Sequence, residues 1–268
     1  MKVALFDMDG TLTESRQKMD KAMCFSLAKL QKAGFKVGIV TGSDIEYVLE
    51  QLSIIFETNS LNFHEIDFWV CNGTKYYTFS EEGKRICHYE KNMLSDIDEG
   101  LYRKLMMSLT GMLKDMIEAF NFPMTGNFID VRGTMINFCP IGRNASKEQR
   151  DKWIEIDKKF MIRSIIINKI QNEMRDSGLS FKKGGDTSID IYPEGWDKTF
   201  VFDKGKRYTN DSVYFFGDRC AGNGNDKEIY DYVKEKYGEE NAREVSSPNE
   251  TIEAIDRIIE KENESIYT

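Results

Sequence analysis

The stretch KVALFDMDGT (residues 2–11) decides the fold. A short, mostly apolar run bounded by polar residues is typical of a buried β-strand. Because the apolar run ends at Phe6, the sequence predicts that Asp7 and Asp9 lie in the loop after the strand. Gly10 permits a tight turn in that loop, and free backbone N–H groups in such a turn bind phosphate oxygens.

The residues that follow alternate between helical and strand patterns. The sequence predicts helices at 18–33 and 44–55 and strands at 36–40 and 67–71. Strands that alternate with helices form parallel sheets with right-handed connections, and their functional side chains gather at the carboxyl ends of the strands. We expect Asp7, Thr41 and Asn72 at those ends.

The middle of the chain follows a different, antiparallel α+β pattern. It predicts helices at 97–121, 146–158 and 162–177 and strands at 127–132, 134–139, 179–183 and 187–192. The parallel pattern returns with a strand at 212–217, a helix from about 226 and a last helix at 250–262. We therefore predict an α/β protein with a parallel-sheet core domain (1–82 and 194–268) and an inserted cap domain (83–193).

Composition excludes several classes of function. The net charge of −8 disfavours nonspecific nucleic-acid binding, which requires a cationic face. The sequence has neither a signal-peptide pattern nor an apolar run long enough to span a membrane. Five scattered cysteines and two isolated histidines point to free thiols and argue against a zinc site. We expect a cytoplasmic protein with no nucleic-acid or membrane partner.

The acids of the first loop suit phosphoryl transfer. The Asp7 carboxylate can attack phosphorus to form an aspartyl phosphate, and Asp9 can exchange a proton with the bridging oxygen. The alternative is a solvated acidic turn. Asp218 follows another apolar strand and could complete a Mg²⁺ site with Asp7, since Mg²⁺ takes one or two carboxylates plus water and phosphate. Asp226 closes the glycine-rich loop after Asp218.

Two further pieces carry weaker signals. Thr41 and Ser43 stand where a strand ends and a helix begins, which suits an anion, but Ser43 or Asp44 could equally be an ordinary helix cap. Lys198 near Asp7 would offset the charge of phosphate and carboxylates, although a surface position is the commonest fate of a lysine.

These pieces, in this order, resemble the four motifs of the haloacid-dehalogenase (HAD) superfamily of phosphotransferases. Further stretches over nearly the whole chain are similar to the eukaryotic-type phosphomannomutases. These stretches are FIDVR (128–132), NFCPIGR (137–143), SID (188–190), PEGWDK (193–198) and FFGD (215–218).

The resemblance implies a HAD-like Rossmannoid core with an α/β cap and a homodimer formed through the cap. It implies interconversion of mannose 6-phosphate and mannose 1-phosphate, with Mg²⁺ and a hexose 1,6-bisphosphate activator, in the supply of GDP-mannose. Asp7 would be the nucleophile, Asp9 the acid/base and Lys198 a further catalytic residue. Asp7, Asp9 and Asp218 would hold the metal. The implied substrate-binding residues are Arg16, Thr41, Ser43, Arg132, Asn137, Arg143, Ser188 and Asp190.

Other functions remain open at this point. A sugar-phosphate phosphatase of the same superfamily would use Asp7 and Asp9 in the same way but transfer the phosphoryl group to water. Arg132 and Arg143 favour the mutase, whereas Thr125, where the family has a basic residue, favours the phosphatase. A silent binding module is disfavoured because both aspartates of the first loop are present.

Overall fold

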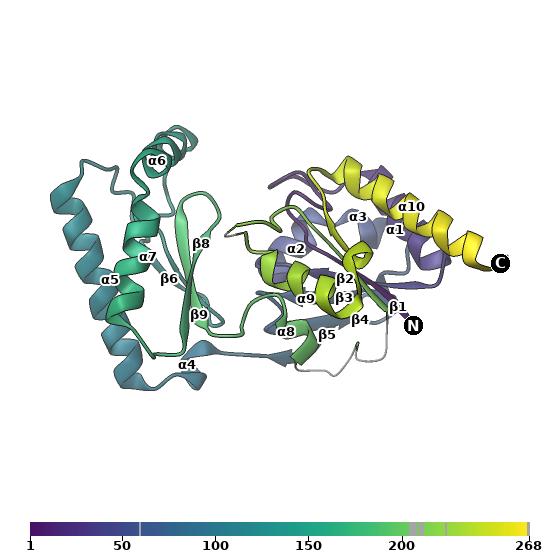
Figure 1. Cartoon of the computed structure of the whole chain (residues 1–268), viewed down its shortest axis with the longest axis horizontal. Coiled ribbons are helices and arrows are strands. Elements are labelled where there is room, and N and C mark those ends of the chain that lie inside the picture. The colour runs from purple at the N-terminus through teal and green to yellow at the C-terminus, as the bar shows by residue number, and fades with distance from the viewer. Residues whose placement is uncertain (59, 204–207, 209–211, 223, 267–268) are drawn as a thin grey trace. The chain divides into compact units, whose positions relative to one another are not determined.

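The computed structural model describes the 268-residue chain except residues 59, 204–207, 209–211, 223 and 267–268 (Figure 1). The chain divides into two compact units. The first, here the core unit, comprises Met1–Glu90 and Gly195–Thr268, and the second, the cap unit, comprises Lys91–Glu194. Each unit has its own sheet.

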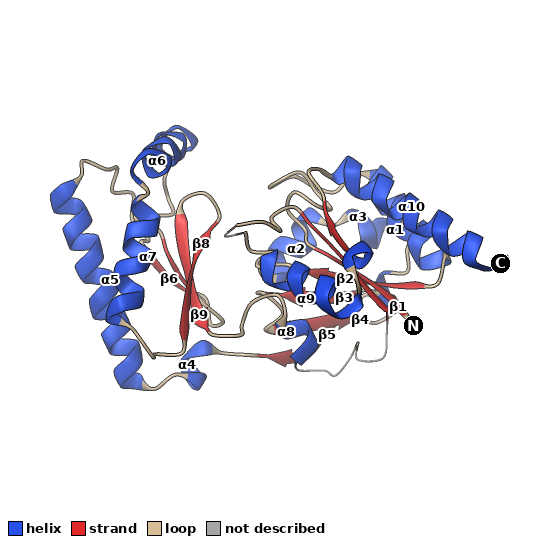
Figure 2. Ribbon diagram, viewed as in Figure 1, coloured by secondary structure: helices blue, strands red, loops and turns tan. Residues whose placement is uncertain are grey.

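The core unit contains a seven-stranded sheet in the order β11-β10-β1-β2-β3-β4-β5 (Figure 2). Its strands are β1 (Lys2–Phe6), β2 (Phe35–Val40), β3 (Asp67–Val70), β4 (Lys75–Phe79), β5 (Arg85–Glu90), β10 (Ser212–Gly217) and β11 (Ala242–Glu244). The first five strands in that order pair in parallel, β4 is antiparallel to β3, and β5 is antiparallel to β4. The mixed α/β fold with a mostly parallel central sheet agrees with the sequence prediction.

Helices connect the parallel strands of the core unit, and a last helix follows β11. They are α1 (Lys21–Lys32), α2 (Ile45–Gln51), α3 (Ile54–Glu57), α8 (Phe200–Asp203), α9 (Lys227–Tyr237) and α10 (Pro248–Ile266), with 3-10 turns η1 (Phe63–Glu65) and η2 (Glu239–Asn241). Asp20 and Asp44 cap α1 and α2 by accepting backbone N–H bonds in their first turns. The single helix expected at 44–55 is thus two short helices, α2 and α3.

Both faces of the central sheet are buried around β1, as a parallel sheet requires. Along β1, Ala4 and Phe6 join one apolar cluster, which includes residues of α1 and α10. Val3 and Leu5 point to the other face and join a second cluster, which includes residues of α9. The alternation follows from the two-residue period of a strand and makes β1 the centre of the unit.

The β4–β5 hairpin extends the core unit beyond the expected domain boundary. The sequence predicts the boundary at residues 82 and 83, whereas β5 pairs with β4 and keeps the chain in the core unit as far as Glu90. The return to the core unit lies at Glu194 and Gly195, one residue from the expected position. The hairpin was missed because its aromatic strand, KYYTF at 75–79, is short and follows a predicted turn.

The cap unit pairs an antiparallel sheet with helices. Its strands, in the order β6-β7-β9-β8, are β6 (Ile129–Val131), β7 (Ile136–Phe138), β8 (Leu179–Gly184) and β9 (Ser188–Pro193). Its helices are α4 (Met93–Asp96), α5 (Glu99–Ala119), α6 (Lys147–Phe160) and α7 (Ile162–Glu173). Helices α5 and α7 pack together and lie on one side of the sheet (Figure 1).

Within the described residues, no helix is both long enough and apolar enough to cross a bilayer.

Candidate active site

The carboxyl ends of three neighbouring strands supply the first group of polar side chains. Asp7 directly follows β1, Thr41 follows β2 and Asp218 follows β10. Phe6 is aligned with Phe216 on one side and Ile39 on the other, so the three strands end at nearly the same level. This is the arrangement that the strand–loop pattern of the sequence predicts.

The loop after β1 turns back on itself so that Asp7 and Asp218 lie close together. The Gly10 N–H donates to the Thr13 carbonyl (2.7 Å), and Gly10 has a φ of +93°, which favours glycine. A Cβ at this position would collide with the Asp218 carboxylate. Gly10 is therefore required both by the backbone conformation and by the space that Asp218 occupies.

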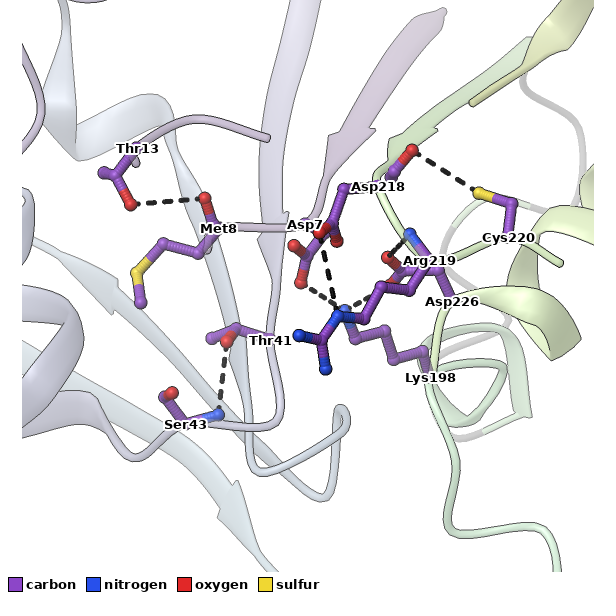
Figure 3. Close-up of polar contacts among 11 residues, drawn as sticks. Asp7, Met8, Thr13, Thr41, Ser43, Lys198, Asp218, Arg219, Cys220 and Asp226 are labelled. Atoms are coloured by element: carbon purple, nitrogen blue, oxygen red, sulfur yellow. Dashed lines mark hydrogen bonds and ion pairs between the residues drawn. The ribbon is translucent and has the colours of Figure 1, made fainter. Parts of the chain in front are cut away.

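Three carboxylates and a lysine meet at this edge of the sheet (Figure 3). The oxygens of Asp7, Asp218 and Asp226 lie within 4.8 Å of one another. Lys198 is fully buried (0% exposed) and donates to Asp7 Oδ1 and to Asp226 Oδ1, the latter at 2.5 Å. A buried lysine needs such partners because its charge is removed from water. The structure thus excludes the surface alternative for Lys198.

The cluster holds more negative than positive charge. Burial and Asp226 raise the pKa of Asp7 to about 7, although Lys198 acts in the opposite direction. Burial and Asp226 likewise raise the pKa of Asp218 to about 6. Burial alone would lower the pKa of Lys198, but Asp226 and Asp7 outweigh it and keep the ammonium charged. The Lys198 ammonium, together with the Arg219 guanidinium 3.8 Å from Asp218 Oδ2, therefore leaves the three carboxylates only partly compensated.

This excess of buried carboxylate charge fits a divalent cation. Mg²⁺ prefers hard oxygen ligands and uses few protein carboxylates. In the part of the chain that the structure describes, Asp7, Asp218 and Asp226 form the one cluster of acidic, cysteine or histidine side chains with metal-ligand spacing. The set differs from the expected Asp7, Asp9 and Asp218, because the Asp226 carboxylate stands in the cluster and that of Asp9 does not.

Asp9 instead faces a pair of hydrogen-bond donors. Its Oδ1 accepts from the Arg16 backbone N–H (2.9 Å) and from the Tyr47 hydroxyl (2.9 Å). This bond holds the backbone of Arg16 against the loop, and Arg16 itself is exposed. Asp9 is half-buried two residues from Asp7, a position that suits an acid/base.

The loop after β2 resolves the alternatives for Thr41 and Ser43. The buried Thr41 Oγ1 accepts from the Ser43 N–H (3.1 Å), whereas the Asp44 carboxylate accepts from the Tyr47 N–H (2.9 Å) and caps α2. The Ser43 carbonyl accepts from the Cys71 N–H (2.9 Å). Asp44 is therefore the cap, and the Ser43 hydroxyl is not needed for that purpose.

Sequence reasoning missed two residues of this site. Asp226 is fully buried, accepts from the Arg219 N–H (3.1 Å) and binds Lys198. The sequence feature that could have identified Asp226 is its position as the acid at the end of the glycine-rich loop after Asp218. Tyr47 had no local signal, because a tyrosine in the first turn of a helix is unremarkable until the fold brings Asp9 to it.

The cap unit gathers a second set of polar side chains on its sheet. Asn137 is aligned with Asp190 on β9 and donates to its Oδ1 (2.6 Å). Arg143 donates to Asn137 Oδ1 (2.9 Å), and its Nε lies 3.5 Å from Asp130 Oδ2. Arg132 donates to the same Asp130 oxygen (2.9 Å). The five residues form a continuous row in which Asp130, missed by the sequence analysis, links the two arginines.

Ser188 lies two residues before Asp190 on β9, and so on the same face of that strand. Its carbonyl accepts from Arg163 (3.2 Å), which also donates to the Gly185 carbonyl (2.8 Å) and pairs with Asp157 (2.7 Å). Arg163 and Asp157 are both buried. This pair fixes the β8–β9 turn from which Ser188 and Asp190 project.

The expected site residues therefore fall into two groups. The core unit brings together Asp7, Asp9, Thr41, Ser43, Lys198 and Asp218, and carries Arg16 on an exposed loop. The cap unit brings together Arg132, Asn137, Arg143 and Asp190, with Ser188 on the same strand as Asp190.

Comparisons with known proteins find relatives over nearly the whole chain. A profile of the family described as "Eukaryotic phosphomannomutase" matches residues 23–261. The chain is 35% identical to a phosphomannomutase of Encephalitozoon cuniculi over 97% of its own length and 94% of the relative's. It is 34% identical to human phosphomannomutase 1 over 85% of its own length and 82% of the relative's.

A solved structure shows the same fold at low sequence identity. The IMP-nucleotidase of Plasmodium falciparum matches with a TM-score of 0.67 and 15% identity, covering 97% of this chain and 68% of that protein. This likeness bears on the fold alone and agrees with a HAD-like core. The profile match and the 35% identity establish more: the chain belongs to the eukaryotic phosphomannomutase family.

Proposed function

We propose that the chain interconverts mannose 6-phosphate and mannose 1-phosphate through an aspartyl phosphate on Asp7. The observation that carries the proposal is the buried Asp7 carboxylate, which lies at a strand end, bonded to Lys198 and beside two more carboxylates, in a chain of this family. Such a carboxylate is shielded from water and held in one orientation, which suits an in-line attack on phosphorus.

Asp7, Asp218 and Asp226 would hold Mg²⁺, which supplies positive charge to the phosphate oxygens. Lys198 favours the ionised form of Asp7 and orients it, because its ammonium bonds both Asp7 and Asp226. As the Asp7 oxygen bonds to phosphorus, the bond from phosphorus to the sugar oxygen breaks. Backbone N–H groups of the loop after β1 and the Thr41–Ser43 loop are the candidates to bind the transferring phosphate.

Asp9 is the proposed acid and base. It gives a proton to the departing sugar oxygen when Asp7 is phosphorylated and takes one back when a sugar hydroxyl attacks the aspartyl phosphate. The same residue thus serves both directions, as a mutase requires. Its separation from the carboxylate cluster supports this role, since a carboxylate bound to metal is a poor proton donor.

The cap row is the proposed site for the rest of the substrate. Arg132 and Arg143 offer planar donor groups that suit the second phosphate. Asn137, Ser188 and Asp190 carry the amide, hydroxyl and carboxylate groups that suit sugar hydroxyls. Arg16 is a further candidate phosphate ligand. A mutase needs such a second site because the bisphosphate intermediate carries a phosphate that is not reacting.

One observation supports a phosphatase as the second candidate. Thr125 occupies the position where the family has a basic residue, and its hydroxyl donates to the Ile141 carbonyl (2.8 Å). It therefore offers a phosphate no positive charge. A weaker hold on the intermediate would let water compete with the sugar for the aspartyl phosphate.

We further propose a cytosolic homodimer that supplies mannose 1-phosphate to GDP-mannose synthesis. Exposed apolar side chains on α5 and α7, such as Met107 (69% exposed) and Ile165 (60%), support an interface on the cap unit.

A product assay tests the proposal. The protein is incubated with Mg²⁺ and mannose 1-phosphate, with and without a catalytic amount of glucose 1,6-bisphosphate, and followed by ³¹P NMR. We expect a mannose 6-phosphate signal that depends on the bisphosphate. Inorganic phosphate as the only product would replace the mutase with the phosphatase, and no turnover of either kind would reject both.

A further inference from the structure

The Asp9 carboxylate is held by one of its two oxygens. Both the Arg16 N–H and the Tyr47 hydroxyl donate to Oδ1, each at 2.9 Å. Among the residues that the structure describes, no donor bonds Oδ2. Because a carboxylate with two donors on one oxygen has a fixed plane, the other oxygen keeps a fixed direction.

Tyr47 is itself held from two sides. It lies in the first turn of α2, where the Asp44 carboxylate accepts from its backbone N–H (2.9 Å). The preceding residue, Glu46, forms an ion pair with Arg85 of β5 (2.6 Å), which ties the same turn to the β4–β5 hairpin. Burial and the Asp9 carboxylate raise the pKa of the Tyr47 hydroxyl, so it stays protonated and remains a donor.

The two donors differ in what a substitution can remove. The Arg16 contact is made by the backbone and survives a change of side chain. The Tyr47 contact depends on a single hydroxyl, which a phenylalanine lacks while keeping the ring. Tyr47 is therefore the side chain on which the orientation of Asp9 depends.

Building on the proposed function, we propose that Tyr47 is a positioning residue that makes Asp9 Oδ2 the atom that exchanges the proton with the sugar. When Asp7 attacks, the bond from phosphorus to the sugar oxygen breaks and that oxygen takes the proton from Asp9 Oδ2. In the return step, a sugar hydroxyl attacks phosphorus, its proton passes to Oδ2, and the bond from phosphorus to Asp7 breaks. Tyr47 keeps its own proton throughout.

The test compares Tyr47→Phe with the wild type in steady-state turnover of mannose 1-phosphate. Mannose 6-phosphate and inorganic phosphate are measured separately in the presence of Mg²⁺ and glucose 1,6-bisphosphate. We expect kcat to fall by about 10- to 100-fold, as for the loss of a hydrogen bond to a charged group, with KM within about twofold. A merely structural role would not separate kcat from KM in this way.

Two controls exclude a general disturbance. Tyr214 is another half-buried tyrosine whose hydroxyl bonds a carboxylate, that of Glu262 (3.4 Å), on β10. Tyr214→Phe is expected to keep wild-type kcat. The second control is inhibition by beryllium fluoride with Mg²⁺, which imitates a phosphorylated aspartate at Asp7. The inhibition constant of Tyr47→Phe is expected to match that of the wild type, because Asp9 and Tyr47 are not needed to form that complex.

Either of two results would overturn the proposal: unchanged kcat in Tyr47→Phe, or a fall in kcat accompanied by an equal loss of beryllium fluoride inhibition. Failure of the proposed function is distinguished by the wild type alone. If the wild type releases only inorganic phosphate, the mutase is rejected, while the Tyr47 comparison is made on phosphate release. Asp9 exchanges a proton in that reaction as well.

Discussion

The polar groups of the core unit and those of the cap unit are held in opposite ways. In the core unit, Asp7, Asp226 and Lys198 are almost fully buried and are positioned by the ends of parallel strands and tight turns. In the cap unit, Arg132 and Arg143 are roughly one-third exposed and are held by other side chains, chiefly Asp130. The first arrangement suits bond making at a fixed atom, and the second suits a ligand that enters and leaves.

The two groups also differ in charge balance. The core cluster has three carboxylates, one buried lysine and the half-exposed Arg219 beside Asp218, whereas the cap row has two carboxylates, two arginines and Asn137. Removing the positive charge of Lys198 from the core cluster should therefore damage stability and chemistry together. Removing a charge from the cap row should affect substrate affinity alone.

The largest effect is expected from Lys198→Met, which leaves buried carboxylates without their ammonium. Breaking a buried ion pair costs about 3–5 kcal/mol in the free energy of unfolding, and we expect a loss of that size in urea denaturation at pH 8 with EDTA. Loss of a charge-stabilising group should also lower kcat by about 10²- to 10³-fold.

Lys29 on α1 provides the matched control, because its ion pair with Asp256 of α10 (3.1 Å) is exposed. Lys29→Met should leave both quantities nearly unchanged. Equal losses in the two variants would show that the burial of Lys198 adds nothing to its effect on the free energy of unfolding or on kcat.

Asp226→Asn should weaken Mg²⁺ binding while preserving the fold, because asparagine has the same shape without the charge. We expect the apparent Mg²⁺ dissociation constant to rise by about 10-fold or more, measured by isothermal titration calorimetry. The control is Asp231→Asn on α9, an exposed partner of Lys227. An unchanged constant for Asp226→Asn would exclude Asp226 from the metal site.

Arg143→Ala tests the cap row. Losing a charge-assisted contact should raise KM for mannose 1-phosphate by about 10- to 100-fold with little change in the melting temperature. Arg103→Ala on α5, an exposed pair with Glu99, is the control. A kcat loss as large as that of Lys198→Met would contradict the assignment of bond making to the core cluster and of substrate binding to the cap row.

The smallest effect concerns pH. The pKa of Asp7 lies at about 7, above its ordinary value of 3.8. The folded, metal-free protein therefore holds a proton that the unfolded chain has lost between these pH values. The preferential binding of this proton stabilises the folded state. The stabilisation is present in full below pH 3.8 and is lost as the pH rises through 7. With EDTA present, deprotonation of Asp7 should therefore lower the melting temperature of the protein between pH 5 and pH 8.

Mg²⁺ reverses that trend, because it binds the ionised carboxylates. Its apparent affinity should increase by about tenfold between pH 6 and pH 8. Calorimetric titrations at both pH values check the sign. An affinity that is the same at both values would contradict the raised pKa of the cluster.

Much of the core site followed from local sequence. Asp7, Thr41 and Asp218 each come directly after an apolar run, and parallel strands bring such ends to one edge whatever the distant packing is. The sequence left two alternatives for Lys198, a position near Asp7 or one on the surface. It could not decide between them, because the burial of a side chain depends on which distant segments cover it. The role of Lys198 as the partner of Asp226 required the three-dimensional structure.

The residues that sequence reasoning missed depend on pairing between distant segments. Asp130 matters because β6 aligns it with Asn137 on β7, and that register is not visible in the pattern of either strand alone. Tyr47 matters because the fold brings the Asp9 carboxylate to its hydroxyl, and nothing in the sequence of the first turn of α2 signals that contact.

The most direct test of the central claim is to find the phosphoryl group on the protein. The wild type and Asp7→Asn are incubated with Mg²⁺ and glucose 1,6-bisphosphate, quenched in acid, digested and analysed by mass spectrometry. The account predicts one added phosphoryl group on the wild-type peptide that contains Asp7, removable by hydroxylamine, and none on Asp7→Asn, which should also lack turnover. Turnover in Asp7→Asn, or a phosphoryl group on another residue, would contradict it.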